Sequence, residues 1–179
     1  YPRLISTYKT EDASGVSINR NYVFIADGKS GIKVIDVTEP EFPVLFDRIE
    51  QADASKILVT KEYAFLADRT GIKILRTYLY GRSFDIASCE TPGKSNAIQV
   101  YDDYIYVADR QAGLQILNYR YASRLNNDSI VSNCKTEYAV NFYLDNNDNN
   151  NVFIADGENG LKIFDISSVF DNSRETLPG

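Results

Sequence analysis

The sequence predicts an all-β fold made of four-stranded antiparallel units, and three observations lead to this prediction. First, an aromatic-apolar segment, Ala-Asp, a turn with Gly and a second apolar segment occur together four times. Second, aromatic and β-branched residues dominate these segments, as is typical of strands. Third, the segments do not alternate between apolar and polar residues, so each strand is expected to be buried on both faces. The four aspartates, 41, 41 and 47 residues apart, are Asp27, Asp68, Asp109 and Asp156.

The first copy shows how the four strands of each unit are expected to follow one another. Residues 15–18 and 22–25 form a hairpin around a two-residue polar turn. The Ala-Asp-Gly-Lys-Ser-Gly turn then leads to a strand at 32–35, and a fourth strand is expected at 43–49. In the later copies, first strands are expected at 55–59, 96–100 and 139–144, and fourth strands are expected at 83–89 and 129–134.

The Asp and Gly of the central turn are interpreted as structural residues and not as a ligand site. A Gly in this position supplies a positive φ without steric cost, and the Asp carboxylate can accept backbone N–H groups. The second copy, Asp-Arg-Thr-Gly, is one residue shorter than the first, Asp-Gly-Lys-Ser-Gly. A hairpin turn tolerates this change in length, whereas a loop that coordinates a ligand usually does not.

Strands that are covered on both faces require a further sheet on either side. Four-stranded antiparallel blades stacked around an axis meet this requirement and form a β-propeller. A two-sheet sandwich is the alternative, but its strands would show a cleaner alternation of apolar and polar residues. We therefore expect a single-domain propeller of four blades.

The N-terminal strand is expected to close the last blade of this propeller. Residues 2–12 match the fourth-strand segment 43–53, while the chain ends soon after a third-strand segment. Pairing of the two ends would remove an open sheet edge. The alternative is a fragment of a larger propeller, which a chain that begins at Tyr1 without Met permits. The expected repeat units are residues 13–53, 54–94, 95–137, and 138–170 plus 1–12.

The first copy, YVFIADGKSGIKVIDVTEPEFPVL, resembles the LVIVD-repeat family. The resemblance covers nearly the whole chain and is good in the fourth copy, but it weakens in the second and third copies. It implies a β-propeller, often found in surface or secreted prokaryotic proteins, and it implies no catalytic residues. The WD40 family fits less well because the chain has neither Trp nor His.

The composition excludes several kinds of chemistry. The formal net charge of -6 argues against nucleic acid or an anionic membrane as the partner, and no apolar run is long enough to cross a membrane. Because the chain has no His, it can build neither a Ser-His nor a Cys-His nucleophile. Cys89 and Cys134 are expected to be buried free thiols, since equivalent positions on neighbouring blades lie too far apart for a disulfide.

One candidate site is the face that carries the turns between second and third strands. Variable residues on a rigid scaffold are a common basis of binding sites. The alternative is a solvated rim of mixed charge. The residues that vary between the copies of this turn are Lys29, Arg69, Arg110 and Glu158.

A second candidate is a patch rich in Tyr and Arg, where the second and third copies depart from the family pattern. Tyr and Arg are enriched in the hot spots of protein interfaces, and both can stack on bases or sugars. The alternative is packing on the outer strands, with Arg stems lying over them. The patch comprises Arg76, Tyr78, Tyr80, Arg82, Tyr119, Arg120, Tyr121 and Arg124.

A third candidate is the Asn-rich insertion at residues 144–152, where Asp145 and Asp148 offer oxygen ligands that suit calcium. The insertion lacks the spacing, the Gly and the terminal Glu of an EF-hand, so an insertion without metal is the favoured interpretation. We assign no other metal, no cofactor and no catalytic residue.

The favoured function is non-catalytic recognition of another protein, at the cell surface or elsewhere outside the cytoplasm. The alternatives are a glycan-binding module, a structural spacer within a larger surface protein, and a glycosidase that uses a pair of carboxylates. The partner is therefore expected to be a protein or a glycan and not a nucleic acid, and membrane insertion is not expected. The missing Met also predicts that the chain is part of a longer chain or of a processed precursor.

Overall fold

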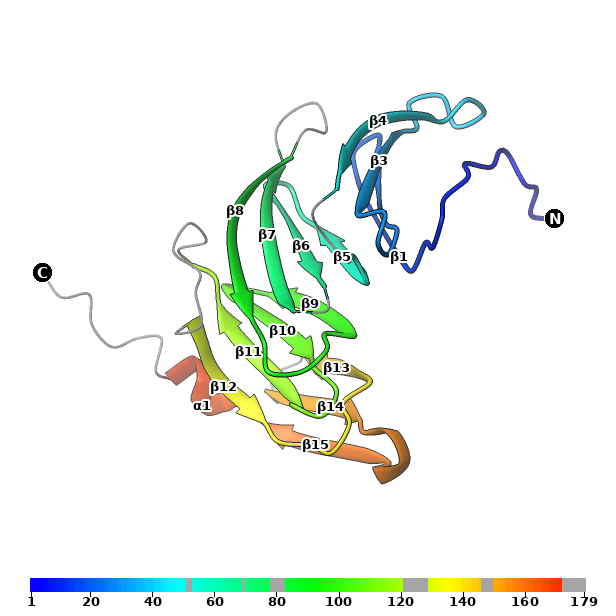
Figure 1. The fold of residues 1–179 in the computed structure, drawn as a ribbon. Coiled ribbons are helices and arrows are strands. Elements are labelled where there is room, and N and C mark those ends of the chain that lie inside the picture. Colours follow the sequence, from blue (N-terminus) through cyan, green and yellow to red (C-terminus); the bar gives the residue numbers. More distant parts are fainter. Residues whose placement is uncertain (51–52, 69, 78–82, 121–128, 146–149, 172–179) are drawn as a thin grey trace, which may run out of the picture.

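Four antiparallel sheets follow one another along the chain in the computed structural model. Figure 1 shows them side by side in an arc, with the N-terminal segment at one end and the helix α1 at the other. Each sheet is a meander, because strands that are neighbours in the sheet are also neighbours in the chain. The residues that the structure describes are 1–50, 53–68, 70–77, 83–120, 129–145 and 150–171.

Three of the sheets have four strands and the last sheet has three. The first sheet consists of β1 (Gly15–Asn19), β2 (Tyr22–Ala26), β3 (Ile32–Asp36) and β4 (Val44–Ile49). The second consists of β5 (Lys56–Val59), β6 (Tyr63–Ala67), β7 (Gly71–Thr77) and β8 (Ser83–Glu90). The third consists of β9 (Ala97–Tyr101), β10 (Tyr104–Ala108), β11 (Leu114–Asn118) and β12 (Ile130–Cys134). The fourth consists of β13 (Asn141–Asp145), β14 (Asn151–Ala155) and β15 (Leu161–Asp165), with the 3₁₀ turn η3 (Gly157–Asn159) before β15 and α1 (Ser167–Asp171) after it.

The turns adopt the conformations that the sequence predicts. Arg20 and Asp102 have φ angles of 55° and 54° in the two-residue turns of their hairpins. Gly31 and Gly113 have φ angles of 77° and 79° at the end of the Asp-Gly turn, a region that favours glycine. The third and fourth strands of the first three sheets also share one irregularity, a bulge at the same repeat position. Such a bulge increases the local twist of a sheet.

The hydrophobic core lies in three layers between neighbouring sheets. Each sheet has a front face, which packs on the following sheet, and a back face, which packs on the preceding sheet. On the first sheet, Phe24 and Val34 belong to the front face, and they pack against Ile57 and Leu66 on the back face of the second sheet. The same two-sided arrangement recurs in the second and third sheets, which explains why their inner strands are apolar on both sides.

The predicted closure of the ring by the N-terminal strand is wrong for this structure. Residues 1–10 form no strand, and among the described residues no fourth strand pairs with β15. In Figure 1 the first and fourth sheets lie at opposite ends of the arc, and the N-terminal segment stays beside the first sheet, where the Ser6 hydroxyl donates to the Pro40 carbonyl at 2.6 Å. The physical reason is that side chains such as Phe24, Phe65 and Tyr106 fill each layer and set the rotation between sheets. Four sheets with this rotation complete only part of a circle, which corresponds to the alternative of a propeller fragment.

The prediction of two buried free cysteines is confirmed. Cys89 packs between the second and third sheets, and Cys134 packs between the third and fourth. Burial raises the pKa of each thiol to about 11. Both residues are therefore neutral at physiological pH and act as small apolar side chains.

Candidate functional site

The repeated aspartates are fully occupied by structural contacts. Asp27 accepts the backbone N–H of Asp12 at 2.6 Å and that of Glu11 at 3.0 Å. In the fourth sheet, Asp156 accepts the N–H groups of Tyr138 and Glu137 at 2.6 and 3.2 Å. Both carboxylates thus bind the segment that leads into the first strand of their own sheet. The interpretation of these aspartates as structural residues agrees with this geometry.

The second and third sheets use the same aspartate with different partners. Asp68 binds within its own turn and accepts the N–H groups of Thr70 and Gly71 at 2.7 and 2.9 Å. Asp109 accepts the N–H of Gly93 at 2.7 Å and the hydroxyl of Thr91 at 2.9 Å. Through its described hydrogen bonds the Asp68 carboxylate thus binds within its own turn, and the other three carboxylates bind the incoming segment.

The surroundings of Asp27 and Asp109 shift the pKa values of these two carboxyl groups in opposite directions. Burial would raise the pKa of Asp27, but the Lys33 ammonium at 2.6 Å and the two backbone amides lower it below the ordinary value of 3.8. Asp109 has no such cation, because Gln115 occupies the position that corresponds to Lys33. Burial therefore raises the pKa of Asp109 above 3.8, although three hydrogen bonds act against this.

The structure does not bring the turn-face residues together as one site. Lys29 and Glu158 are exposed at opposite ends of the arc, on the first and the fourth sheet. Arg110 is half-buried, and its guanidinium donates to the Tyr138 hydroxyl at 3.0 Å while lying over the Tyr138 ring. Among the described residues, no hydrogen bond or ion pair joins these three side chains to one another. Arg69 lies outside the described residues.

The described members of the Tyr/Arg patch have packing roles. Tyr119 lies edge-on to Phe65 in the layer between second and third sheets, and its hydroxyl donates to the carbonyl of Asp102 at 2.9 Å. Arg76 is exposed and lies over the ring of Tyr63. Arg120 is also exposed and stands 3.7 Å from an Asp103 carboxylate oxygen. The members outside the described residues are Tyr78, Tyr80, Arg82, Tyr121 and Arg124.

The calcium candidate receives no further support. Asp145 is half-buried at the end of β13, and Asp148 lies outside the described residues. Within the described part of the chain, no three His, Cys, Asp or Glu side chains gather in a way that could hold a metal ion.

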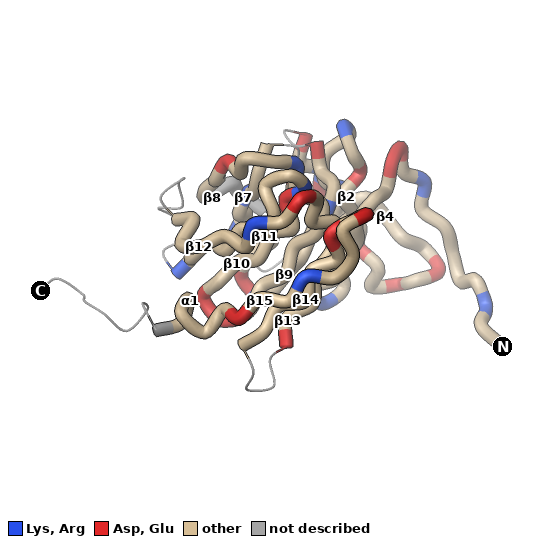
Figure 2. Tube along the Cα trace, turned by 90° about the horizontal axis from the view of Figure 1, so that it is seen from below, with Lys and Arg blue, Asp and Glu red and all other residues tan. Residues whose placement is uncertain are grey.

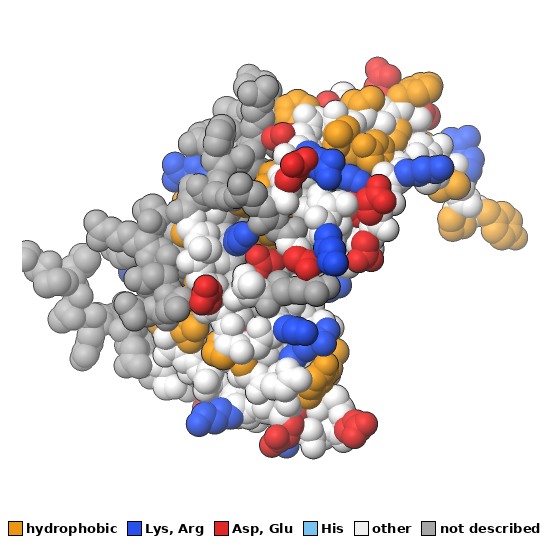
Figure 3. All heavy atoms as spheres, viewed as in Figure 1, with side chains coloured by type: hydrophobic (Ala, Val, Ile, Leu, Met, Phe, Trp, Pro, Cys, Tyr) orange, Lys and Arg blue, Asp and Glu red, His pale blue; other side chains and the backbone are white. Residues whose placement is uncertain are grey.

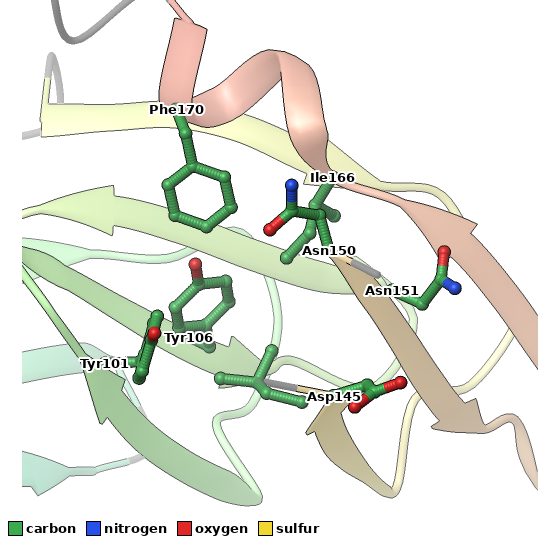
Figure 4. Close-up of a pocket in the computed structure, with 8 residues that line it drawn as sticks. Tyr101, Tyr106, Asp145, Asn150, Asn151, Ile166 and Phe170 are labelled. Atoms are coloured by element: carbon green, nitrogen blue, oxygen red, sulfur yellow. The ribbon is translucent and has the colours of Figure 1, made fainter. Parts of the chain in front are cut away.

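A pocket that the sequence analysis missed lies between the third and fourth sheets. Its volume is about 110 Å³. Figure 4 shows the Tyr106 hydroxyl pointing into it, with Tyr101 and Phe170 as further aromatic walls and Asn150 beside it. The other lining residues are Leu144, Asp145, Asn151 and Ile166.

Tyr106 is the distinctive residue of this pocket. Its side chain is fully buried, and its hydroxyl has no hydrogen-bond partner among the described residues. Burial raises the pKa of Tyr106 far above its ordinary value, so the group is a neutral hydrogen-bond donor. The aligned position holds Phe24, Phe65 and Phe153 in the other copies, and this single Tyr was the signal that the sequence offered.

At the two ends of the arc, apolar side chains are exposed at repeat positions that are buried in the interior sheets. We call the surface formed by Val16, Ile18, Val23, Ile25 and Leu45 the open back face of the first sheet. We call the surface formed by Tyr143, Phe153, Ala155, Leu161 and Ile163 the open front face of the fourth sheet. Figure 3 also shows hydrophobic side chains over β4 and along the N-terminal segment.

Lys and Arg alternate with Asp and Glu along the described part of the chain, as Figure 2 shows. The structure describes one α-helix, α1, and it is too short to cross a membrane. The two open faces are therefore the surfaces whose chemistry differs most from an ordinary solvated surface.

Two designed proteins of solved structure share the fold of this chain. The computationally designed Ika4 protein has a TM-score of 0.69 at 11% sequence identity, and the match covers 93% of this chain and 99% of that protein. The computationally designed Ika8 protein has a TM-score of 0.66 at 10% identity, with 89% of this chain and 48% of that protein covered. No curated protein matches the chain in sequence.

The stacked meander sheets and the likeness to designed propellers define the chain as a β-propeller repeat protein, which confirms the predicted fold class. The sheets form an open arc and not a closed ring. The LVIVD repeat family model matches residues 11–50, 92–118 and 149–169, which confirms the resemblance that the sequence shows. The first and fourth copies match as expected and the second does not, whereas the third copy, where a weaker resemblance was expected, matches up to Asn118.

Proposed function

We propose that this LVIVD-repeat protein is a non-catalytic recognition module that binds another protein through its open back face and open front face. One observation carries the proposal. Leu161 and Ile163 on the open front face are 63% and 58% exposed, whereas Leu114 and Ile116 at the same positions of the third sheet are fully buried. Covering one such side chain contributes about 1.5–3 kcal/mol, so a partner that covers these faces would gain considerable free energy.

The open back face supports the same proposal. Val16 is 69% exposed, while Ile57 at the same position of the second sheet is 6% exposed. A partner that fits either face must present apolar residues on a flat sheet surface, as the neighbouring sheets of this chain do. Recognition of a protein is favoured over recognition of a solute, because the exposed residues are apolar and extend over several strands.

The non-catalytic part of the proposal is supported by the contacts of the repeated aspartates. Asp27, Asp109 and Asp156 accept backbone and hydroxyl groups inside the fold, and Asp68 accepts groups of its own turn. These carboxylates therefore have a structural explanation that requires no acid–base role. A location outside the cytoplasm remains a prediction from the family resemblance.

Photo-crosslinking in the cells that naturally produce the protein tests the proposal. Benzoylphenylalanine would replace Ile163 on the open front face or Ile18 on the open back face, and Phe42 would serve as the control. Phe42 is 72% exposed but lies in a loop outside both faces. We expect a protein adduct at Ile163 and Ile18 and none at Phe42. Absence of any adduct at both faces would contradict the proposal.

A second candidate function is binding of a small polar ligand such as a sugar in the pocket around Tyr106. The buried hydroxyl without a partner favours it, because such a group needs a water or ligand atom as acceptor. A volume of about 110 Å³ fits one part of a sugar and not a whole glycan. The aromatic walls and the nearby Asn and Asp side chains suit a polyhydroxy compound.

Saturation-transfer NMR with a panel of simple hexoses tests this second function. We expect Tyr106→Phe to abolish the transfer signal of any hexose that binds the unmodified protein. Tyr143→Phe is the matched control, because it removes an exposed tyrosine hydroxyl outside the pocket. Equal signals in both variants would place the binding elsewhere, and no signal for any hexose in the unmodified protein would remove the support for sugar binding.

A further inference from the structure

We infer that the protein recognised by the two open faces is a second copy of this chain, and that two copies form a closed ring. The open front face of each copy packs on the open back face of the other. Residues Arg3–Tyr8 of each copy supply the fourth strand beside β15 of the other. This inference rests on the proposed function, and four features of the chain support it.

The first feature is the conformation of Gly160 at the start of β15. In the complete sheets, a Cβ at Gly31 or Gly113 would overlap the carbonyl oxygen of Ile49 or Cys134 in the adjacent fourth strand. Gly160 has the same φ of 77° as Gly31, but a Cβ there would meet no atom within 4 Å. The fourth sheet thus keeps the turn geometry and the free space for a strand, and no described residue of the same chain occupies that space.

The second feature is the segment that would provide this strand. Residues 8–12 read Tyr-Lys-Thr-Glu-Asp, and residues 134–138 read Cys-Lys-Thr-Glu-Tyr. The two segments also make the same contacts, since each donates two backbone N–H groups to the aspartate of the following sheet. Residues 134–138 directly follow the fourth strand β12, so the residues before position 9 occupy the corresponding place for a strand of a preceding sheet.

The third feature is the backbone joint between consecutive sheets. Gly28 in the first turn exchanges two hydrogen bonds, of 3.1 and 3.0 Å, with Ala54 at the entrance of the second sheet. Arg110 and Ala139 form the same joint between third and fourth sheets. The corresponding residue of the fourth turn, Gly157, already has a φ of 58°, close to the 54° of Gly28, and it is exposed.

The N-terminal segment carries the other half of this joint. Asp-Ala-Ser occurs at residues 12–14 and again at 53–55, where its alanine is the partner of Gly28. Ala13 is exposed, whereas Ala54 is 1% exposed. Gly157 of one copy and Ala13 of the other therefore have the residue type and backbone needed for the same pair of hydrogen bonds.

The fourth feature is the shape of the first sheet and of the arc. A groove of about 590 Å³ lies beside the open back face, with Tyr8, Ala13, Val16 and Ile25 among its lining residues. The chain matches 48% of the longer designed protein Ika8 with a TM-score of 0.66, which is close to the TM-score of 0.69 for its match to 99% of Ika4. Its curvature is thus compatible with half of a larger ring, which a second copy would complete. A head-to-tail interface of two copies closes as a ring when the rotation allows it.

Sedimentation velocity of the purified chain at micromolar concentration tests the inference. We expect a particle of twice the chain mass of 20.2 kDa. Gly160→Asn should yield the single chain, because its Cβ would meet the incoming strand; circular dichroism should show that the variant stays folded, since a φ of 77° with a ψ of -138° favours glycine. Gly157→Asn is the matched control and should keep the doubled mass, since Arg110 shows that a side chain fits at that position of the joint.

Charge substitutions on the two faces test the direction of the contact. Ile163→Lys and Ile18→Lys should each yield single chains, and an equimolar mixture should recover part of the doubled mass through the one intact front-to-back contact. If Ile163→Lys alone disrupts the particle, the contact is front-to-front and the inference is wrong. A single chain for the unmodified protein, or an open-ended polymer, would also overturn it. The crosslinking at Ile163 and Ile18 distinguishes these failures, since an adduct with a different protein leaves the proposed function standing.

Discussion

At the residue scale, the repeated aspartates form a natural comparison of one carboxyl group in four settings. Asp27 lies beside Lys33, while Asp109 lies near Gln115, and the pKa of the first is lowered while that of the second is raised. Both side chains are fully buried and accept backbone N–H groups. At Asp27 the Lys33 ammonium and two backbone N–H groups outweigh the effect of burial, whereas at Asp109 burial prevails.

Asp27→Ala should destabilise the protein strongly. The substitution removes the acceptor of the N–H groups of Glu11 and Asp12 and leaves the Lys33 ammonium without its carboxylate. We expect the free energy of unfolding to fall by about 3 kcal/mol, because a hydrogen bond to a charged group contributes about 1.5–3 kcal/mol. Urea unfolding measures this loss, with Asp36→Ala as control. A similar loss in Asp36→Ala, whose carboxylate binds only the nearby Thr38, would contradict the prediction.

Gln115→Lys should give a pH-dependent gain in stability. The folded-state pKa of Asp109 is raised above 3.8, so its ionisation at higher pH costs stability that a nearby ammonium would restore. The variant should be more stable than the unmodified protein at pH 7, and the gain should disappear as the pH falls below the folded-state pKa of Asp109. Urea unfolding at pH 7 and pH 3 checks this, and an equal gain at both values would contradict it.

Asp27 and Asp156 should change the free energy of unfolding with pH in the opposite direction from Asp109. Their folded-state pKa values lie below 3.8, so on acidification the unfolded state binds protons first. The stability that these carboxylates provide is present above about pH 3.8 and is lost as the pH falls through their folded-state pKa. Replacing Asp156 with Asn should therefore flatten the acid limb of the curve of unfolding free energy against pH, and an unchanged acid limb would contradict this.

At the element scale, each complete sheet depends on the close approach of its fourth strand to the glycine of the central turn. The carbonyl oxygens of Ile49, Cys89 and Cys134 lie where a Cβ of Gly31, Gly71 or Gly113 would stand. The bulge shared by the last two strands of these sheets lies farther along the same pair of strands. The glycine thus serves both the turn conformation and the pairing of the fourth strand.

Gly31→Ala should separate these two roles when it is compared with Gly157→Ala. Both positions have positive φ, so both variants carry the strain of roughly 1 kcal/mol that a side chain meets there. Only Gly31→Ala also forces β4 away from β3. We therefore expect its free energy of unfolding to fall by at least about 2 kcal/mol more than that of Gly157→Ala. Thermal unfolding with a calorimetric enthalpy measures the difference, and equal losses would show that backbone strain alone matters.

At the scale of the whole molecule, the arc leaves one front face and one back face uncovered, and among the described residues no fourth strand pairs with β15. Every interior layer joins a front face to a back face, so the two ends of the arc are complementary by construction. Head-to-tail association follows the same packing rule as the interior of the chain and requires no new kind of contact.

Removal of residues 1–7 should distinguish closure within one chain from closure between two. These residues form no strand, so the free energy of unfolding of the single chain should change by less than about 1 kcal/mol. The doubled mass should be lost, because β15 would have no strand to pair with. Urea unfolding at low concentration and sedimentation at high concentration measure the two effects. A loss of several kcal/mol in the single chain would show that the N-terminal segment closes its own ring.

The candidate sites were only partly predictable from the sequence. The repeated Asp and Gly could be interpreted because their contacts are local, within a turn or with the segment just before the same sheet. The roles of Arg110 and Tyr119 could not, because their partners, Tyr138 and Phe65, belong to neighbouring sheets. Tyr106 stood out only as a Tyr at a position of Phe, and its pocket depends on α1 and β13.

The sequence by itself determined the sheets, their strand order, the turns, and the burial of both faces of the inner strands in the second and third sheets. These features follow from short-range hydrogen bonding and from apolar patterns that repeat in every copy. Only the tertiary structure decided that the N-terminal strand does not reach the last sheet, and which faces are left open. The rotation between sheets depends on how side chains such as Phe24, Phe65 and Tyr106 fill each layer. A repeat pattern is the same whether its last face is covered by its own chain or by another, so the pattern alone could not determine closure.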